Sequence, residues 1–416
     1  MPQVELISNI THYYYTGLSL LRSGLLGNYI TGPSALATEQ WLSHLGGPFA
    51  RAYRERRLAG LPPDKVKRMW LPEILQKAVG KFGGTGEQAN WTHNELFARR
   101  AAELMGECDA VHFVQSVGRE SARRAKREGA KVVCDMRSEH PQFQKDILLE
   151  EGRKLGVNVV IPGSTYEHRV LEELYLADAI FTPSHYAKRT FVQEGFSADR
   201  VVVCPYGVDT SAFLPRPMPR VEETFTVLFL GNICMRKGIH YLLEAFAKAA
   251  LRNAKLILAG PIDPSFRSIL HKFDGLFEAP GPIPRSELHR YYRQSDVFVI
   301  PSLADAYPLV TMEAMASGLP VIVSENTGTS ELVRNRQNGF VVPIRSAEAI
   351  AEKLCWLYEN RRECASMGAA AMITAKKQNW ENYGKACQKF YKNFLGGRET
   401  PGASQEDGIS AATLAR

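Results

Sequence analysis

Short runs of consecutive apolar residues alternate with amphipathic stretches through the second half of the chain. The apolar runs cover residues 224–231, 255–260, 297–301 and 320–324, and helical patterns over residues 239–251, 286–295 and 309–318 separate them. Strands that are apolar on both faces and alternate with amphipathic helices are typical of a parallel sheet with helices on both sides. This half therefore predicts a doubly wound α/β domain.

The first half repeats the pattern less regularly. Apolar runs predict strands at 4–8, 110–118, 131–135, 179–184 and 201–207, and residues 122–129 predict a helix. Residues 31–106 contain few strand signals and predict mostly helices. At roughly 150 residues per domain, a chain of 416 residues is long enough for two such domains.

The clearest boundary between the two halves is rich in proline. Three prolines at alternate positions in LPRPMPR, residues 214–220, stiffen the chain and remove backbone donors, which predicts an interdomain linker at 214–223. We therefore assign residues 1–213 to the first domain and 224–378 to the second. Residues 379–395 predict an aromatic-rich helix that returns to the first domain, and residues 396–416 predict a mobile tail.

Composition fits an ordinary globular enzyme. Hydrophobic residues make up 45% and charged residues 23%, and the net charge of +7 suits anionic substrates without requiring nucleic acid. The seven cysteines form no C-x-x-C pair and no zinc spacing, so we expect reduced thiols and a cytoplasmic protein.

Neither a secretory signal nor a membrane span is expected. The first ten residues contain Glu5 and no basic run, and no apolar run approaches the roughly 18 residues that cross a bilayer. Residues 50–70 carry seven Lys or Arg against Glu55 and Asp64. A solvated helical face explains this segment best, and peripheral docking on an anionic inner membrane surface is the alternative.

Two loops that follow predicted strands carry candidate chemistry. In GNICMRKG, residues 231–238, Arg236 and Lys237 lie at a strand-to-helix turn. Arg offers a planar fork of donors and Lys a point charge, so the pair can neutralise a diphosphate. Two solvated surface charges are the alternative interpretation.

The second loop lies in PSLADAYPLVTMEAMASGLPV, residues 301–321, and contains Asp305 before a helix that starts near Leu309. A helix N-terminus offers unpaired N–H groups to a phosphate. Glu313, one turn inside the helix, can accept hydrogen bonds from the two hydroxyls of a ribose, and Asp305 can hold sugar hydroxyls. A helix-turn charge and a loop cap are the alternatives for these two carboxylates.

Together with four further segments, these motifs resemble the retaining glycosyltransferases of family four (group 1). The segments are YRQSDVFVIPS (292–302), EAMASGLPVIVS (313–324), NTGTSELV (326–333) and NGFVVP (338–343). The first half resembles the family more loosely, mainly over residues 177–213. This family has the GT-B fold of two facing Rossmann-like domains with a cleft between them, so the resemblance implies an α/β protein of that architecture.

The resemblance implies that a hexose-type sugar is moved from a nucleoside-diphosphate sugar to a hydroxyl acceptor, which is a glycan, a lipid-linked molecule or a small molecule. Arg236 and Lys237 would bind the diphosphate, Glu313 the ribose and Asp305 the donor sugar. The family usually has Glu where Asp305 stands, so the hydroxyl contact given to this position is in question. The remaining donor-binding candidates are Gly231, Asn232, Tyr307, Leu309 and Val310 around the phosphates, and Pro282 and Ile283 near the base.

In the first domain the resemblance implies different contacts. The family's Gly-Gly loop is replaced by SNITHYYYTG, residues 8–17, so Asn9, Thr11 or His12 would occupy the cleft, or the acceptor loop has been rebuilt. The segment VVCDMRSEHP, residues 132–141, nominates His140 as a contact to the donor sugar. A hydrogen-bonded loop histidine is the alternative for His140.

The absence of any Asp-x-Asp sequence predicts that no divalent metal and no other cofactor is needed. Arg236, Lys237 and the helix dipole would then stabilise the leaving diphosphate, and we assign no protein nucleophile. Two alternatives are a nucleotide-sugar epimerase or hydrolase on the same fold, and a non-catalytic nucleotide-sugar-binding protein. The sequence does not fix the oligomeric state.

Overall fold

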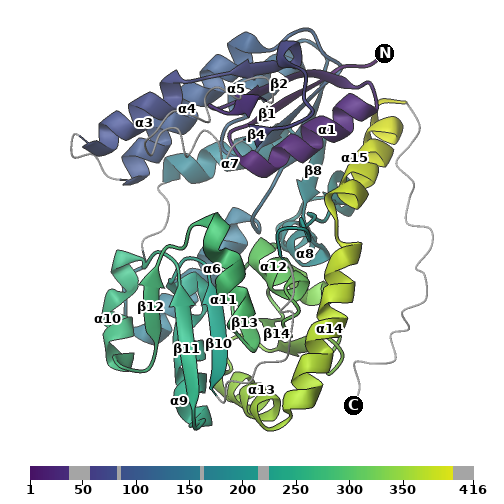
Figure 1. Ribbon diagram of the computed structural model, residues 1–416. Helices are drawn as coiled ribbons and strands as arrows, with labels where there is room; N and C mark the ends of the chain where they lie inside the picture. Colours follow the sequence, from purple (N-terminus) through teal and green to yellow (C-terminus); the bar gives the residue numbers. More distant parts are fainter. Residues whose placement is uncertain (37–56, 82–85, 160–163, 214–223, 397–416) are drawn as a thin grey trace.

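Two parallel sheets, one in each half of the chain, organise the structure (Figure 1). The computed structural model describes residues 1–36, 57–81, 86–159, 164–213 and 224–396. The predicted linker, 214–223, and the predicted tail from residue 397 onward lie outside the described residues.

The first sheet has seven strands in the order β5-β2-β1-β6-β7-β8-β9. Its central strands are buried along their whole length, as expected for strands with helices on both faces. The strands are β1 (Val4–Ser8), β2 (Leu26–Thr31), β5 (Val66–Arg68), β6 (Ala110–Val114), β7 (Lys131–Asp135), β8 (Ala179–Thr182) and β9 (Val201–Val203). A separate pair, β3 (Ala35–Leu36) and β4 (Arg57–Leu58), forms a small second sheet.

Helices cover this first sheet and connect its strands. They are α1 (Tyr14–Arg22), α3 (Leu71–Lys81), α4 (Gly86–Leu104), α5 (Arg119–Arg127), α6 (Pro141–Leu155), α7 (Ser164–Leu176) and α8 (His185–Gln193). The short 3-10 turns of this half are η1 (Thr11–Tyr13), η3 (Pro63–Lys65) and η4 (Ala198–Arg200).

The second sheet has six strands in the order β12-β11-β10-β13-β14-β15. They are β10 (Phe225–Leu230), β11 (Ala254–Ala259), β12 (Glu278–Gly281), β13 (Val297–Ile300), β14 (Val321–Ser324) and β15 (Gly339–Val342). The helices are α9 (Ile239–Ala249), α10 (Arg267–Leu270), α11 (Leu288–Arg293), α12 (Leu309–Ala316), α13 (Ala347–Glu359) and α14 (Arg361–Lys377). The 3-10 turns are η5 (Met235–Lys237), η6 (Pro264–Phe266), η7 (His271–Phe273), η8 (Arg285–Glu287) and η9 (Gly328–Leu332).

Both sheets reverse their strand order at the centre. From β1 the chain adds β2 and β5 on one side and β6 onward on the other, and from β10 it adds β11 and β12 before β13 pairs with the opposite edge. Ligands of doubly wound sheets bind beyond the carboxyl ends of the strands at such a switch point. The loops after β1, β6, β10 and β13 are therefore the places to look for a site.

The fold class predicted from the sequence, two doubly wound α/β domains, is confirmed. Of the strands in the two large sheets, β2, β5, β12 and β15 were not predicted, and neither was the small pair β3 and β4. The β2 strand contains Gly27 and Asn28, and β12 is an edge strand whose residues are mostly exposed, so their apolar signal is weak.

The basic segment 50–70 also differs from its expected helical face. Residues 66–68 form β5, and three of the basic side chains donate to carbonyls of their own domain: Lys65 to Leu26, Lys67 to Leu104 and Arg68 to Ser34. Residues 50–56 lie outside the described part of the chain.

The last helix, α15 (Trp380–Leu395), returns from the second domain to the first (Figure 1). It packs against α1, where the Tyr383 hydroxyl lies 2.7 Å from Thr16 Oγ1 and the Trp380 ring stacks on Tyr15 with centroids 4.2 Å apart. The Tyr391 hydroxyl also lies 2.6 Å from Nδ1 of His112, at the centre of the first sheet. The second half of the chain therefore contributes to the core of the first domain.

A second connection between the domains is made by α6. Glu151 on this helix is fully buried and accepts hydrogen bonds from His240 (2.8 Å), Tyr241 (2.8 Å) and Arg345 (2.7 Å), all in the second domain. These donors outweigh the effect of burial and lower the pKa of Glu151 to about 2. A helix that follows a strand of the first domain is thus anchored on the second.

Among the described residues, no helix combines the length and apolarity that a bilayer crossing requires.

Candidate active site

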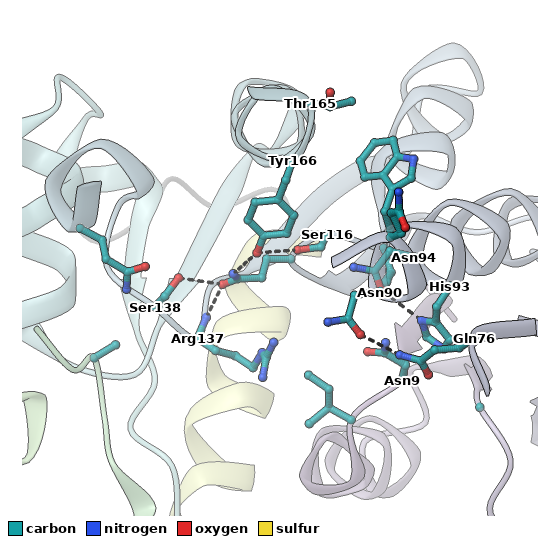
Figure 2. A pocket seen from close by; sticks show the side chains of 18 of the residues that line it. Asn9, Gln76, Asn90, His93, Asn94, Ser116, Arg137, Ser138, Thr165 and Tyr166 are labelled. Atoms are coloured by element: carbon teal, nitrogen blue, oxygen red, sulfur yellow. Dashed lines mark hydrogen bonds between the residues drawn. The ribbon is translucent and has the colours of Figure 1, made fainter. Parts of the chain in front are cut away.

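A cavity of about 1060 Å³ lies where the two domains meet, and Figure 2 shows most of its side chains. Most of the lining comes from loops that follow strands of the first sheet and from the helices α3, α4 and α7. The second domain contributes Arg236, Asp305 and Ala306. The site is therefore built by both domains, at the ends of their central strands.

The two loops of the second domain that carry the candidate chemistry lie against each other. The Leu303 N–H donates to the Arg236 carbonyl oxygen at 2.9 Å. Gly238, which ends the Arg-Lys turn, has φ +64°, and a Cβ atom there would lie 2.1 Å from the Pro301 carbonyl oxygen. Only glycine permits this close approach, so Gly238 fixes the spacing between the loop after β10 and the loop after β13.

The side chains of these loops form a buried cluster of charges. Lys237 Nζ pairs directly with Asp305 Oδ2, and Arg236 Nη1 donates to the Ala304 carbonyl at 2.7 Å and lies 4.0 Å from Asp305 Oδ1. Ser302 Oγ lies 3.5 Å from Asp305 Oδ2. In the ligand-free chain, Asp305 thus compensates the two cations.

Burial and charge act in opposite directions on these cations. Burial lowers the pKa of Lys237, and the Asp305 carboxylate offsets this only in part. Burial also acts to lower the pKa of Arg236, but Asp305 and Glu139 outweigh it, so the net shift is upward. The arginine is therefore a fixed positive charge on the cavity wall.

Glu313 is the fifth residue of α12, about one turn into the helix, and is 4% exposed. Its Oε2 accepts a hydrogen bond from the Tyr292 hydroxyl at 3.0 Å, and its Oε1 lies 3.6 Å from Arg285 Nη1. Burial raises the pKa of Glu313, and Arg285 and Tyr292 oppose the shift. One of the two carboxylate oxygens is thus held only by an exposed arginine, which a hydroxyl ligand can replace.

The other donor-side candidates surround α12 and β10. Leu309 and Val310 are the first two residues of α12, and among the described residues no side chain caps this helix N-terminus. Tyr307 is buried against Tyr206 of the first domain, with ring centroids 5.9 Å apart. Gly231 and Asn232 follow β10, with φ +141° at the glycine, and Pro282 and Ile283 follow the edge strand β12.

In the first domain, His12 is not among the residues that line the cavity. Its ring packs between Tyr13 (centroids 4.8 Å apart) and Tyr206 (5.0 Å), and its buried Nε2 has no hydrogen-bond partner in the part of the chain that the structure describes. Burial, with Arg137 and Arg285 nearby, lowers the pKa of His12 to about 3, so the ring is neutral. Asn9, another candidate in this loop, lines the cavity (Figure 2).

The structure also places His140 away from the cavity lining. The ring packs on Phe191 and Phe196, with centroids 5.4 and 5.5 Å away, and its Nδ1 accepts from the Gln142 N–H at the start of α6. Burial lowers the pKa of His140 to about 4. The ring thus caps α6 and fills an aromatic pocket, and its buried Nε2 has no hydrogen-bond partner among the described residues. The contact of His140 with a donor sugar stays a prediction.

The neighbours of His140 in sequence face the cavity and were not singled out from the sequence. Arg137, Ser138 and Glu139 all line it, and the Arg137 side chain is exposed. The only signal for them was their place directly after β7. A charged residue in a loop is common, so that signal was too weak without the tertiary contacts.

Amide side chains dominate the first-domain wall. Figure 2 shows Asn9, Gln76, Asn90 and Asn94 together on one side. On the other side, Gln115 Oε1 accepts from the Arg137 N–H (2.9 Å) and from Ser138 Oγ (3.2 Å). Amides donate and accept, so this wall suits a ligand rich in hydroxyl groups.

Part of this wall is held in an unusual backbone conformation. Ser116 has φ +78°, and its N–H donates to the buried carboxyl of Glu173 at 2.6 Å. Gly118 and Arg119 donate to the other oxygen of Glu173, at 2.9 and 3.0 Å. These bonds fix the loop after β6, and with it Gln115 and Ser116.

Among the described residues, no group of three or more His, Cys, Asp or Glu side chains gathers in a way that could hold a metal ion.

The two facing doubly wound domains, with a cavity between the carboxyl ends of their central strands, define the GT-B class of proteins. Solved structures of similar fold include sucrose-phosphate synthase from Thermosynechococcus elongatus, with a TM-score of 0.63 and 18% identity over 95% of this chain and all of the other. Anabaena HepE in complex with UDP and glucose matches with a TM-score of 0.62 and 14% identity, again over 95% of this chain and all of the other.

Sequence comparison leads to a family. Residues 224–360 match the family described as Glycosyl transferases group 1. A D-inositol 3-phosphate glycosyltransferase from Pseudarthrobacter chlorophenolicus is 29% identical over 342 residues, which cover 78% of this chain and 76% of the relative. The second domain thus matches the group 1 family, and the chain as a whole is similar to its members, as the motifs in the sequence indicated.

Proposed function

We propose that this glycosyltransferase moves a hexose-type sugar from a nucleoside-diphosphate sugar to a hydroxyl acceptor, with retention at the anomeric carbon and without a divalent metal. The observation that carries the proposal is the contact between the Arg-Lys turn and the Asp305 loop, which places two cations at the switch point of the second sheet. Adjacent fixed cations at such a point suit a diphosphate.

The diphosphate would take over the cations from Asp305. Arg236 and Lys237 then face the charge that develops on the leaving group, where fixed donors lower the barrier most. The uncapped N-terminus of α12 offers the N–H groups of Leu309 and Val310 as further donors. With this much positive charge supplied by the protein, no metal is needed for the leaving group.

The nucleoside would lie along α12 on the other side of the diphosphate. The ribose hydroxyls would donate to Glu313 in place of its contact with Arg285, while Tyr292 keeps the carboxylate oriented. The base would lie near Pro282 and Ile283. HepE, which has this fold, was solved in complex with UDP and glucose, and this supports a nucleotide sugar as the donor.

The acceptor would enter on the amide-rich wall of the first domain. The acceptor hydroxyl attacks the face of the sugar that the diphosphate leaves, and the leaving phosphate oxygen takes the proton. No protein nucleophile is required. A glycan, a lipid-linked molecule or a small polyol all present the necessary hydroxyl groups, and the name of the D-inositol 3-phosphate relative supports a polyol.

A binding panel followed by a transfer assay tests the proposal. Thermal shifts with uridine, guanosine and adenosine diphosphates and their hexose derivatives identify the donor, and transfer to a panel of glycans and polyols is then followed by NMR. We expect one nucleotide series to stabilise the protein and the product to keep the donor's anomeric configuration in the presence of EDTA. Inversion, loss of activity with EDTA, or epimerised sugar without an acceptor would contradict it.

A further inference from the structure

One carboxyl group on the cavity wall lacks a hydrogen-bond partner. Glu139 is 1% exposed, and its Oε1 contacts no donor in the described part of the chain, while Oε2 accepts from Gln144 Nε2 at 3.2 Å. A buried acceptor without a hydrogen bond is destabilising. Native proteins keep few such atoms, and those that line a cavity point to a ligand.

Glu139 lies at the reactive end of the cavity. It belongs to the first domain, in the loop between β7 and α6. Its pKa nevertheless responds to the charges of Arg236, Asp305 and Lys237, which are all in the second domain. Glu139 and Asp305 line the same cavity from opposite domains. The carboxyl is thus near the cations that would hold the donor diphosphate.

Until the diphosphate takes over its two cations, Asp305 has little capacity left to accept a hydrogen bond from a sugar hydroxyl. Its Oδ2 is engaged by Lys237 and Ser302, and its Oδ1 faces Arg236. The side chain is also one methylene shorter than the Glu that the family usually has here. Glu139 Oε1, by contrast, lies at this end of the cavity without a hydrogen-bond donor among the described residues.

We propose that Glu139 forms a subsite for a sugar hydroxyl, in which the open Oε1 contacts a hydroxyl group of a sugar bound between the domains. The subsite rests on the proposed transferase function and assigns to this chain a first-domain carboxyl that touches substrate. Gln144 holds the other oxygen, and the neighbouring Ser138 and Gln115 can complete the hydrogen bonds of the hydroxyl.

A hydroxyl fits this position better than a cationic group does. Burial raises the pKa of Glu139, and the nearby Arg236 opposes that shift. A hydroxyl donates to a carboxylate and accepts from a carboxylic acid, so it suits Glu139 in either protonation state. An ammonium group would instead meet the positive charge of Arg236 and Lys237.

Two variants and one control test the subsite. Glu139→Gln keeps the shape of the side chain, Glu139→Ala removes it, and Asp146→Asn makes the same carboxylate-to-amide change at an exposed position of α6. Thermal unfolding checks the fold of each. Isothermal titration then measures binding of the nucleoside diphosphate that the panel selects and of its hexose derivative, and the transfer assay measures the acceptor KM.

We expect both Glu139 variants to bind the nucleoside diphosphate within about twofold of wild type. Either their affinity for the nucleotide sugar should fall about tenfold or more, or their acceptor KM should rise by that factor. A hydrogen bond to a charged group is worth about 1.5–3 kcal/mol, which corresponds to roughly 10- to 150-fold. Loss of affinity for the nucleotide sugar places the hydroxyl on the donor sugar, and a raised acceptor KM places it on the acceptor. Asp146→Asn should match wild type in both.

The contrary outcomes separate the two proposals. If wild type binds and transfers normally and both Glu139 variants equal it, the subsite is wrong and the transferase function stands. The same holds if the variants bind the nucleoside diphosphate as weakly, relative to wild type, as they bind the nucleotide sugar. If wild type neither binds any nucleotide sugar nor transfers a sugar, the proposed function is wrong and the subsite with it.

Discussion

At the residue scale, charge compensation organises the candidate active site. Arg236 and Lys237 share Asp305, and Glu313 is held between Tyr292 and Arg285. Each charged group that would meet the donor already has an internal partner. When the donor binds, its contacts with these charged groups replace their internal contacts. No buried charge is therefore left without a partner.

Arg236→Ala tests the role of the fixed cation. We expect kcat to fall by about a hundredfold or more, because removing one donor that stabilises transition-state charge has an effect of that order. Steady-state kinetics and nucleotide titration measure it, with Arg252→Ala, an exposed arginine after α9, as the control. Unchanged turnover and donor affinity in the Arg236 variant would exclude this residue from the site.

Gly238→Ala tests the close approach of the two loops. A positive φ costs an alanine roughly 1–2 kcal/mol, and here the Cβ atom would also lie 2.1 Å from the Pro301 carbonyl. We therefore expect a larger loss, seen as a lower urea midpoint and weaker nucleotide binding. The control is Gly275→Ala, which has φ +83° with nothing within 4 Å of the added atom and should show the backbone cost alone. Equal losses in the two variants would contradict the proposed packing role.

At the element scale, α6 is the clearest departure from the division into two domains. It follows a strand of the first sheet, starts beside Glu139 and His140, and is anchored in the second domain through Glu151. Its N-terminal end reaches the cavity, and its C-terminal half is fixed to α9 and Arg345. Any motion between the domains therefore changes the position of α6 relative to one of them.

Glu151→Gln should reveal this anchor in the stability of the protein. Removing the charge takes the carboxylate partner from His240 and leaves Arg345 paired with Glu150, so we expect a loss below the roughly 3–5 kcal/mol that breaking a fully buried pair costs. Urea unfolding at pH 7 measures the loss. Glu348→Gln, which breaks a surface ion pair with Lys248, should leave the midpoint unchanged.

The anchor also predicts a pH dependence with a defined sign. The pKa of Glu151 is about 2 in the folded chain against 4.5 as its ordinary value. The unfolded chain therefore takes up the proton first as the pH falls, so the contribution of Glu151 is fully present above pH 4.5 and is lost between 4.5 and 2. In that range wild type should lose more stability than Glu151→Gln. Parallel pH profiles of the two proteins would show that Glu151 is not the group responsible.

At the scale of the whole molecule, α14 and α15 connect the two domains along one side (Figure 1). At their junction a Cβ atom on Gly207 would lie 2.3 Å from the Trp380 nitrogen, so the first domain closes directly on the start of α15. This junction is where we expect the domains to pivot when the donor binds.

Trp380→Ala tests that junction. The ring stacks on Tyr15 and lies near Tyr206, so its loss should lower the free energy of unfolding by about 3 kcal/mol, the low end for large-to-small aromatic changes. Denaturant unfolding measures it, with Tyr175→Ala, a 72% exposed aromatic, expected to stay within about 0.5 kcal/mol of wild type. A Trp380 variant as stable as that control would mean that the helix holds the domains without this contact.

The sequence by itself determined the architecture and located the candidate donor-side residues, since both depend on local sequence pattern, while the roles of these residues toward a donor stay predictions. Buried parallel strands need consecutive apolar residues, and a strand-to-helix turn needs its glycine and its charges at fixed spacing, so Arg236, Lys237, Asp305 and Glu313 could be named in advance. Edge strands such as β12, which bury little, left no such pattern.

Tertiary structure alone decided which first-domain residues face the cavity and which carboxylates are already engaged. In DMRSEHP the choice between Glu139 and His140 depends on where α6 begins and on the aromatic pocket that accepts the His140 ring, and neither is local information. The anchoring of α6 by Glu151 likewise requires His240 and Arg345, which lie 89 and 194 residues away in the sequence. Contacts between such distant residues form only after both sheets are assembled.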